Sequence, residues 1–254
     1  MGRPRKGARV PASTERRAAA VVTGASSGIG RALAVRFAAT VEQLVLIGRD
    51  RARLDAVARQ AESQGAQVSC HVTRLDAPAE LDALALALGK LPALSALLHA
   101  AGEYASDPVA ASKASDFDRL LAVNLRAPYV LTRALLDPLQ RGSGDIVFIN
   151  SSAAGQRRAE LSAYGASKAG LVAFADSLRQ ECNPLGLRVL SVFLGATATP
   201  LQAHIHARAG RRYEPTTLLQ AEDVAAIVHA ALALPRGAEV TDLHLRPAAA
   251  HRAG

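Results

Sequence analysis

The chain has 254 residues, 50% of them apolar, which is enough to bury the core of one large domain or of two small ones. No segment reaches the roughly 18 consecutive apolar residues of a membrane-spanning helix, and no apolar segment follows the basic N-terminus as in a secretion signal. A membrane protein is thereby excluded, and we expect a soluble, cytoplasmic one. The net charge of +8 does not by itself indicate a nucleic-acid-binding domain, because residues 1–17 alone carry six basic residues and one acidic residue.

Residues 1–17 also contain two prolines and two glycines and have too little apolar surface to fold alone. We predict that they form a basic, disordered N-terminal extension; the alternative is an arm that contacts an anionic partner. Residues 18–248 are predicted to form one domain, followed by a short tail at 249–254. Cys70 and Cys182 lie far apart without metal-type spacing, and we expect both to be reduced, buried and unreactive.

From residue 18 onward, short runs rich in Val, Ile and Leu alternate with longer segments of helical periodicity, which is the pattern of repeated βαβ units. Several runs are apolar at consecutive positions, as in parallel strands that helices bury on both faces. The predicted strands are residues 18–23, 43–47, 66–72, 93–99, 145–150, 187–193 and 240–245. The expected fold class is therefore α/β: a Rossmann-type, doubly wound, mainly parallel seven-stranded sheet with helices on both faces.

The first predicted strand leads into a glycine-rich turn, TGASSGIG at residues 23–30, and a helical pattern follows at once. Gly24 permits a tight turn, Gly28 permits the backbone to approach a pyrophosphate, and Gly30 lets the helix pack close to the strand. The helix N-terminus offers free N–H groups to phosphates. The alternative is a glycine-rich turn without a ligand. We expect cofactor contacts from Gly24, Ser26, Ser27, Gly28, Ile29 and Gly30.

The residues at the end of the second strand indicate whether a site of this kind binds NAD or NADP. Gly48 stands where NAD-binding sites carry an acidic residue that accepts the ribose hydroxyls. Arg49 follows it, and a guanidinium suits a 2′-phosphate through charge-assisted hydrogen bonds. We therefore expect NADP (NADPH) rather than NAD. The alternative for Arg49 is a solvated residue at the start of the next helix, with Asp50 as its cap.

The three-residue spacing between the first two glycines resembles that of the short-chain dehydrogenase/reductase family. Residues 99–102, HAAG, follow the fourth strand where the family has Asn-Asn-Ala-Gly, which implies cofactor contacts from Ala101 and Gly102. Asn124, in a helix expected to begin near Leu120, matches the family's helix asparagine. That asparagine bends the helix and holds a water of the proton relay. The family's adenine-binding position falls at residues 71–76, on His71, Thr73 or Asp76, and stays unassigned.

The most specific element is the pair Tyr164 and Lys168, which lie four residues apart and project from one face of a helix. Free tyrosine has a pKa of about 10 and is a poor base at neutral pH. We expect the neighbouring ammonium to lower the Tyr164 pKa and so to activate it for proton transfer. The resemblance implies that Lys168 also holds the nicotinamide ribose and that Tyr164 and Asn124 contact the cofactor as well.

A serine at the end of the fifth strand is expected to polarise the substrate oxygen. Ser151 lies thirteen residues before Tyr164, which is the family's usual spacing, and Gly144 lies seven before Ser151. Ser152 is the alternative, because Gly155 follows it by three residues. We favour Ser151 for its position on the strand.

Residues 194–199, LGATAT, follow the sixth strand and resemble the family's Pro-Gly-x-x-x-Thr segment beside the nicotinamide. The resemblance implies cofactor contacts from Gly195, Thr197 and Thr199, with Leu194 in place of the proline. Residues 201–219 are predicted to be a mobile loop that acts as a lid. The two histidines of that loop have no nearby metal-ligand partners, and we expect no metal site.

The resemblance covers nearly all of the chain after the basic tail and implies a short, single-domain, NADP-preferring oxidoreductase. Hydride passes between NADP(H) and a carbonyl or alcohol substrate, and Tyr164 exchanges the proton. Lys168 activates Tyr164, Ser151 polarises the oxygen, and Asn124 supports the water relay. The substrate pocket is expected after Gly102, around residues 153–161 and in residues 201–219. Similar proteins form homodimers or homotetramers through the helices that bear Asn124 and Tyr164.

Two other functions were weighed. The first is a catalytically silent NADP-sensing regulatory protein whose basic tail contacts nucleic acid, since fold does not determine function. Sensor relatives commonly lack the tyrosine or the lysine, whereas Tyr164 and Lys168 are both present, so the enzyme is favoured and nucleic acid is not expected as a partner. The second is an epimerase or dehydratase, which usually needs a longer C-terminal segment than the 55 residues that follow Thr199.

Overall fold

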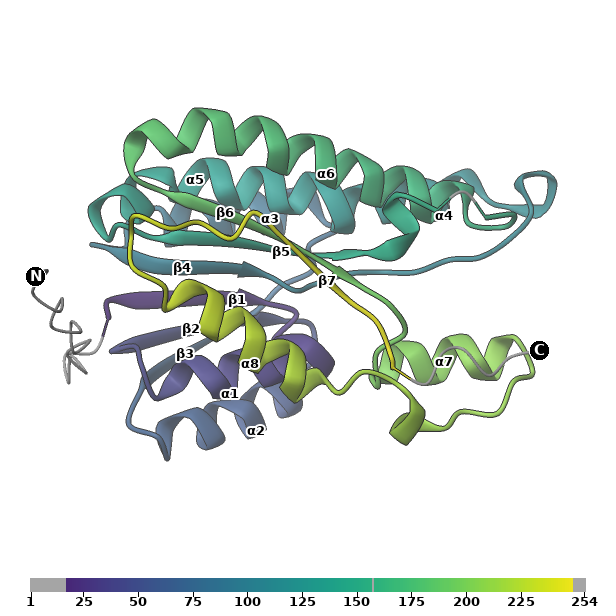
Figure 1. Cartoon of the computed structure of the whole chain (residues 1–254), viewed down its shortest axis with the longest axis horizontal. Coiled ribbons are helices and arrows are strands. Elements are labelled where there is room, and N and C mark those ends of the chain that lie inside the picture. Colours follow the sequence, from purple (N-terminus) through teal and green to yellow (C-terminus); the bar gives the residue numbers. More distant parts are fainter. Residues whose placement is uncertain (1–16, 157, 249–254) are drawn as a thin grey trace, which may run out of the picture.

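The apolar runs of the chain form seven parallel strands that hydrogen-bond into one sheet, in the order β3-β2-β1-β4-β5-β6-β7 (Figure 1). The computed structural model describes residues 17–156 and 158–248. The strands are β1 (Ala19–Thr23), β2 (Gln43–Gly48), β3 (Gln67–Val72), β4 (Leu94–His99), β5 (Asp145–Ser151), β6 (Arg188–Leu194) and β7 (Asp242–Leu245). Each begins and ends within two residues of the predicted segment. The predicted fold class is confirmed.

Helices connect the strands and cover both faces of the sheet (Figure 1). They are α1 (Gly28–Ala38), α2 (Arg51–Glu62), α3 (Pro78–Leu88), α4 (Ala114–Leu121), α5 (Ala127–Arg141), α6 (Ser162–Cys182), α7 (Pro200–Arg208) and α8 (Ala221–Leu232). Shorter helical turns are η1 (Val109–Ala111), η2 (Ala122–Arg126), η3 (Ser152–Ala154), η4 (Asn183–Leu185) and η5 (Pro215–Thr217), of which η2 is a π-helix. No helix in the described ranges is long and apolar enough to cross a membrane.

Two apolar clusters lie on opposite faces of the sheet. Side chains of α1, α2 and α8 pack with one set of strand residues, and side chains of α3, α5 and α6 pack with the alternate set. In β1, for example, Val22 belongs to the first cluster and Val21 to the second. Burial on both faces is the physical reason why these strands are apolar at consecutive positions.

Several predicted details differ from the structure. The helix before Asn124 begins at Ala114 rather than near Leu120. Residues 201–219 are not a loop throughout, because Pro200 stands at the start of α7 and the Thr199 side chain accepts a hydrogen bond from the Gln202 N–H, which caps this helix.

The two cysteines and the ends of the chain complete the comparison with the prediction. Both thiols are free; Cys182 is buried, whereas Cys70 is only half-buried, on the edge strand β3. The predicted extension and tail lie outside the described residues except for Arg17. Arg17 belongs to the fold, since its backbone hydrogen-bonds Thr40 and Glu42.

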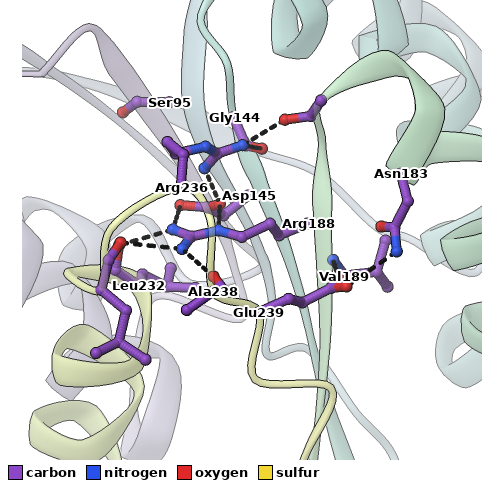
Figure 2. A network of polar contacts seen from close by, with 12 residues as sticks. Ser95, Gly144, Asp145, Asn183, Arg188, Val189, Leu232, Arg236, Ala238 and Glu239 are labelled. Carbon is purple, nitrogen blue, oxygen red and sulfur yellow. Dashed lines mark hydrogen bonds and ion pairs between the residues drawn. The ribbon is translucent and has the colours of Figure 1, made fainter.

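Three arginines from separate parts of the chain converge on the buried carboxylate of Asp145, at the start of β5. Arg188 of β6 lies 2.8 Å from it, Arg17 lies 3.1 Å from it, and Arg236, after α8, lies 2.5 Å from it. Arg188 also donates to backbone carbonyls of residues 232, 234 and 238, so it fixes the segment after α8 against the sheet (Figure 2). Asp145, where β5 begins, therefore links the residue before β1 to β6 and to the segment after α8.

We predict that Asp145→Asn destabilises the protein by about 3 kcal/mol or more, because it leaves the buried Arg188 guanidinium without its counter-charge. The free energy of unfolding in urea measures this. The matched control is Asp82→Asn, since Asp82 is exposed and lies 3.8 Å from Arg126; its cost should stay below about 1 kcal/mol. Equal losses in the two variants would contradict a structural role for the Asp145 cluster.

Candidate active site

A cavity of about 510 Å³ lies where β1, β2, β4, β5 and β6 end. The strand order reverses between β1 and β4, and the crevice at such a point is where open α/β sheets bind ligands. The predicted site residues that line this cavity are Gly24, Ser26, Ser27, Gly28, Ile29, Gly30, Arg49, Ala101, Gly102, Ser151, Tyr164, Lys168, Gly195, Thr197 and Thr199. Asn124 does not line it but is buried, with 1% of its surface exposed.

The glycine-rich turn packs directly against the end of β4. Gly24 has a φ of +66°, and a Cβ there would lie 2.7 Å from the Ala101 backbone. A Cβ at Gly30 would lie 2.2 Å from the Gly24 carbonyl oxygen. Thr23 Oγ1 accepts hydrogen bonds from the N–H groups of Ala100 and Ala101, both at 3.1 Å. These contacts require small residues and hold the start of α1 at the cavity.

The first turn of α1 is suited to bind phosphate. Its N-cap residue, Ser27, makes no side-chain capping hydrogen bond, so the N–H groups of the turn are available at the cavity. Gly28 has a φ of +52°, and a Cβ there would lie 3.0 Å from the Thr199 methyl group. Glycine at position 28 therefore leaves room for the Thr199 side chain. The sequence had suggested only that it leaves room for a pyrophosphate.

Arg49 meets a carboxylate that the sequence analysis missed. Its guanidinium lies 2.6 Å from Glu103 Oε1, and Arg119 of α4 lies 2.6 Å from Glu103 Oε2. A Cβ at Gly48 would lie 3.2 Å from Ser26 Oγ, which is tight for an acidic side chain at that position. Glu103 directly follows the HAAG segment, but no motif marked it, because its partners lie 54 and 16 residues away.

The end of β3 narrows the candidates for adenine contact. Thr73 and Asp76 line the cavity, whereas His71 is not among the lining residues. Arg74 lies 2.9 Å from Asp76 and holds the pKa of that carboxyl below its ordinary value. Asp76 is therefore ionised at neutral pH and already has an arginine partner.

Asn124 lies in the π-helical segment η2 and connects two elements of the site. Its Oδ1 accepts from the Glu103 N–H at 2.9 Å, and its Nδ2 donates to the Glu103 carbonyl at 3.0 Å. Nδ2 also donates to Ser167 Oγ at 3.0 Å, and Ser167 Oγ donates to the Tyr164 carbonyl at 2.8 Å. The π turn at residues 122–126 is a local irregularity of the helix at the position of Asn124.

Tyr164, in the first turn of α6, is half-buried beside Ser151 and Tyr104. Burial raises the pKa of Tyr164 above its ordinary value, a hydrogen bond with the Ser151 side chain lowers it, and nearby Tyr104 raises it. The rings of Tyr104 and Tyr164 meet edge to face with centroids 5.0 Å apart. Ser151 Oγ also accepts from the Ala153 N–H at 3.1 Å. Of the two candidate serines, Ser151 is therefore the one that contacts Tyr164.

Lys168 is buried one turn further along α6, and its Nζ donates to the Ile149 carbonyl at 3.0 Å. Burial lowers the pKa of Lys168 to about 8. The expectation that Lys168 lowers the Tyr164 pKa is not met in this structure, because burial outweighs the other influences on Tyr164 and the ammonium is turned to a backbone carbonyl. At neutral pH the phenol is protonated and the ammonium is charged.

His99 stands where a family asparagine was expected and is buried within the fold. Its Nε2 lies 2.9 Å from Thr132 Oγ1, and its ring stacks on Phe148 with centroids 5.0 Å apart. Burial lowers the pKa of His99 to about 3, so the ring is neutral. It supports the end of β4 and does not line the cavity.

His206 of α7 has protein partners within the described residues. His206 Nδ1 lies 2.9 Å from the Gln202 carbonyl, and its ring packs against Tyr213. Within residues 17–156 and 158–248, no group of three or more His, Cys, Asp or Glu residues is placed to hold a metal ion.

Comparison with known proteins agrees with this geometry. A family model described as short chain dehydrogenase matches residues 18–210. A short-chain type dehydrogenase/reductase of Sinorhizobium fredii is 31% identical over 237 residues, which are 90% of this chain and 90% of that protein.

Two solved structures have the same fold over most of their length. A short chain dehydrogenase from Burkholderia cenocepacia, in complex with NADP, is 28% identical with a TM-score of 0.79, over 92% of this chain and 98% of that one. A short-chain dehydrogenase from Sphingobium yanoikuyae, in complex with NADPH, is 30% identical with a TM-score of 0.77, over 88% and 87%. The chain belongs to the short-chain dehydrogenase/reductase family.

Proposed function

We propose that the protein is an NADPH-dependent reductase of carbonyl compounds, and that Tyr164 is the proton donor. The observation that carries this proposal is that a protonated Tyr164 and a charged Lys168 line one cavity, which the glycine-rich turn and Arg49 also line. A protonated phenol is suited to give a proton to an oxygen that gains negative charge. The raised Tyr164 pKa therefore favours the reductive direction.

The proposed cofactor is NADP(H). The turn at residues 23–30 and the start of α1 would hold the pyrophosphate, and Arg49 would bind the 2′-phosphate. Ala101, Gly102 and the segment 195–199 would lie along the remainder of the cofactor. The similar structures of 28% and 30% identity contain NADP and NADPH, which supports this assignment.

NADPH, when bound, supplies a hydride to the carbonyl carbon. Tyr164 donates its phenolic proton to the carbonyl oxygen, and Ser151 donates a hydrogen bond to the same oxygen. Lys168 holds the ribose hydroxyls, and its positive charge stabilises the tyrosinate left after proton transfer. Asn124 holds Glu103 and Ser167 in place, and we assign it the support of a water that returns the proton to the site.

The substrate would enter beside Tyr164 and Tyr104, between residues 153–161 and α7. We propose that two or four copies associate through the helices beside Asn124 and Tyr164, where the exposed ring of Phe117 lies on α4. The sensor alternative depends on a basic tail outside the described residues. No observation favours it over the enzyme.

Tyr164→Phe should lower the rate of carbonyl reduction about 100-fold or more, because it removes the proton donor. NADPH binding, followed by its fluorescence, should stay unchanged because the ring remains. Tyr129→Phe is the matched control, since Tyr129 is exposed on α5 and does not line the cavity. A Tyr164→Phe variant that keeps most of the NADPH oxidation would show that another group supplies the proton.

NADPH affinity should depend on the charge of Lys168. Its pKa is lowered to about 8, so the ammonium is present below that pH and is lost as the pH rises above it. The dissociation constant for NADPH should therefore be level below about pH 8 and rise above it. Lys168→Arg keeps its charge and should move this rise to higher pH. If the wild type and the variant lose affinity over the same pH range, Lys168 is not the titrating group.

Arg49→Gln should weaken NADPH binding about tenfold or more, since a charge-assisted pair with the 2′-phosphate is lost. NADH has no 2′-phosphate, and its affinity should not fall. Arg53→Gln serves as the control because Arg53 is exposed, pairs with Asp50 and does not line the cavity. Equal losses for NADPH and NADH in Arg49→Gln would contradict recognition of the 2′-phosphate.

A further inference from the structure

Two arginines that have no role in the proposed cofactor site line the same cavity. Arg158 lies between η3 and α6, six residues before Tyr164, and Arg211 follows α7. Within the described part of the chain, neither side chain forms a hydrogen bond or an ion pair. Both are exposed at the cavity, so their charges are free to bind a ligand.

Neighbouring arginines in the segment after α7 differ from Arg211. Arg208 lies 3.5 Å from Asp107, and Arg212 lies 3.0 Å from Glu214. Both are ion-paired, and neither lines the cavity. Arg211, between them in the chain, lines the cavity and has no carboxylate partner in the described residues. The segment therefore leaves its one cavity-lining arginine without a counter-charge in the part of the chain that the structure describes.

The acidic residues that line the cavity do not balance these arginines. They are Asp76 and Glu103. Asp76 already pairs with Arg74, and Glu103 pairs with both Arg49 and Arg119. The charged Lys168 lies at the same cavity. The charged side chains that line the cavity are therefore mostly positive, and a cleft lined by positive charge concentrates anions.

We propose that the substrate carries an anionic group, a carboxylate or a phosphate, which Arg158 and Arg211 bind while Tyr164 faces the carbonyl oxygen. This inference rests on the proposed reductase function and adds the chemical class of the substrate. A guanidinium fits both anions through paired N–H donors. The cofactor phosphates are assigned to other residues, the glycine-rich turn after β1 and Arg49 after β2.

The test uses the full chain and matched pairs of carbonyl compounds: an oxo acid with its methyl ester, and an oxo phosphate monoester with its unphosphorylated alcohol. The charged member should have a kcat/KM about tenfold or more above that of its neutral partner. The double variant Arg158→Gln/Arg211→Gln should lose this preference and keep its rate with the neutral members. Its NADPH dissociation constant should not change. Which pair shows the preference distinguishes a carboxylate from a phosphate.

Arg59→Gln controls for the loss of a positive charge, because Arg59 is exposed on α2 and away from the cavity. It should keep the wild-type preference. If the neutral members react as well as the charged ones, or if the double variant keeps the preference, the anionic substrate class is wrong while the reductase function stands.

If no carbonyl compound is reduced, the reductase function is wrong, and binding then decides the inference by itself. The same oxo acid and oxo phosphate are titrated by calorimetry into the wild type and the double variant, each saturated with NADP⁺. Binding that is lost in the double variant supports the two arginines as an anion site. Binding that is equal in both proteins, or absent from both, overturns it.

Discussion

The close approach of two backbone segments, at the ends of the neighbouring strands β1 and β4, is the constraint on which the site depends. A Cβ at Gly24 would overlap the Ala101 backbone, and a Cβ at Gly30 would overlap the Gly24 carbonyl, so neither position has room for a side chain. Thr23 fixes the contact by accepting two backbone hydrogen bonds from the end of β4. This contact places the N-terminus of α1 beside the segment that carries Glu103. The glycine-rich turn and the residues around Asn124 consequently border one cavity.

Burial then sets the charges at that cavity. It raises the Tyr164 pKa and lowers the Lys168 pKa, since a low-dielectric environment disfavours the charged form of each group. The two groups are nevertheless in complementary states at neutral pH, one a neutral acid and the other a cation. In the proposed reduction, proton donation from Tyr164 would create an anion one helical turn from Lys168, so their attraction would be strongest after the transfer. Charge would then be stabilised where it develops, which is what catalysis requires.

Local patterns predicted most of this arrangement. The predicted strand bounds agree with the structure to within two residues, because apolar runs between helical segments report burial directly. Fourteen of the fifteen predicted cofactor contacts line the cavity. Long-range pairs could not be found in this way: Arg17 reaches Asp145 across 128 residues, and Glu103 reaches Arg49 across 54. The direction of the Tyr164 pKa shift was not predicted, because it depends on how far the phenol is removed from solvent and not on the spacing of residues in α6.

Transfer of deuterium from NADPH labelled at the transferable position of the nicotinamide tests the central claim most directly. Labelled cofactor is incubated with the full-length protein and a panel of charged and neutral carbonyl compounds, and each product alcohol is analysed by mass spectrometry. An NADPH-dependent reductase places one deuterium on the former carbonyl carbon. Tight binding of NADPH without deuterium in any product would contradict the account and would indicate a protein that binds the cofactor without turnover.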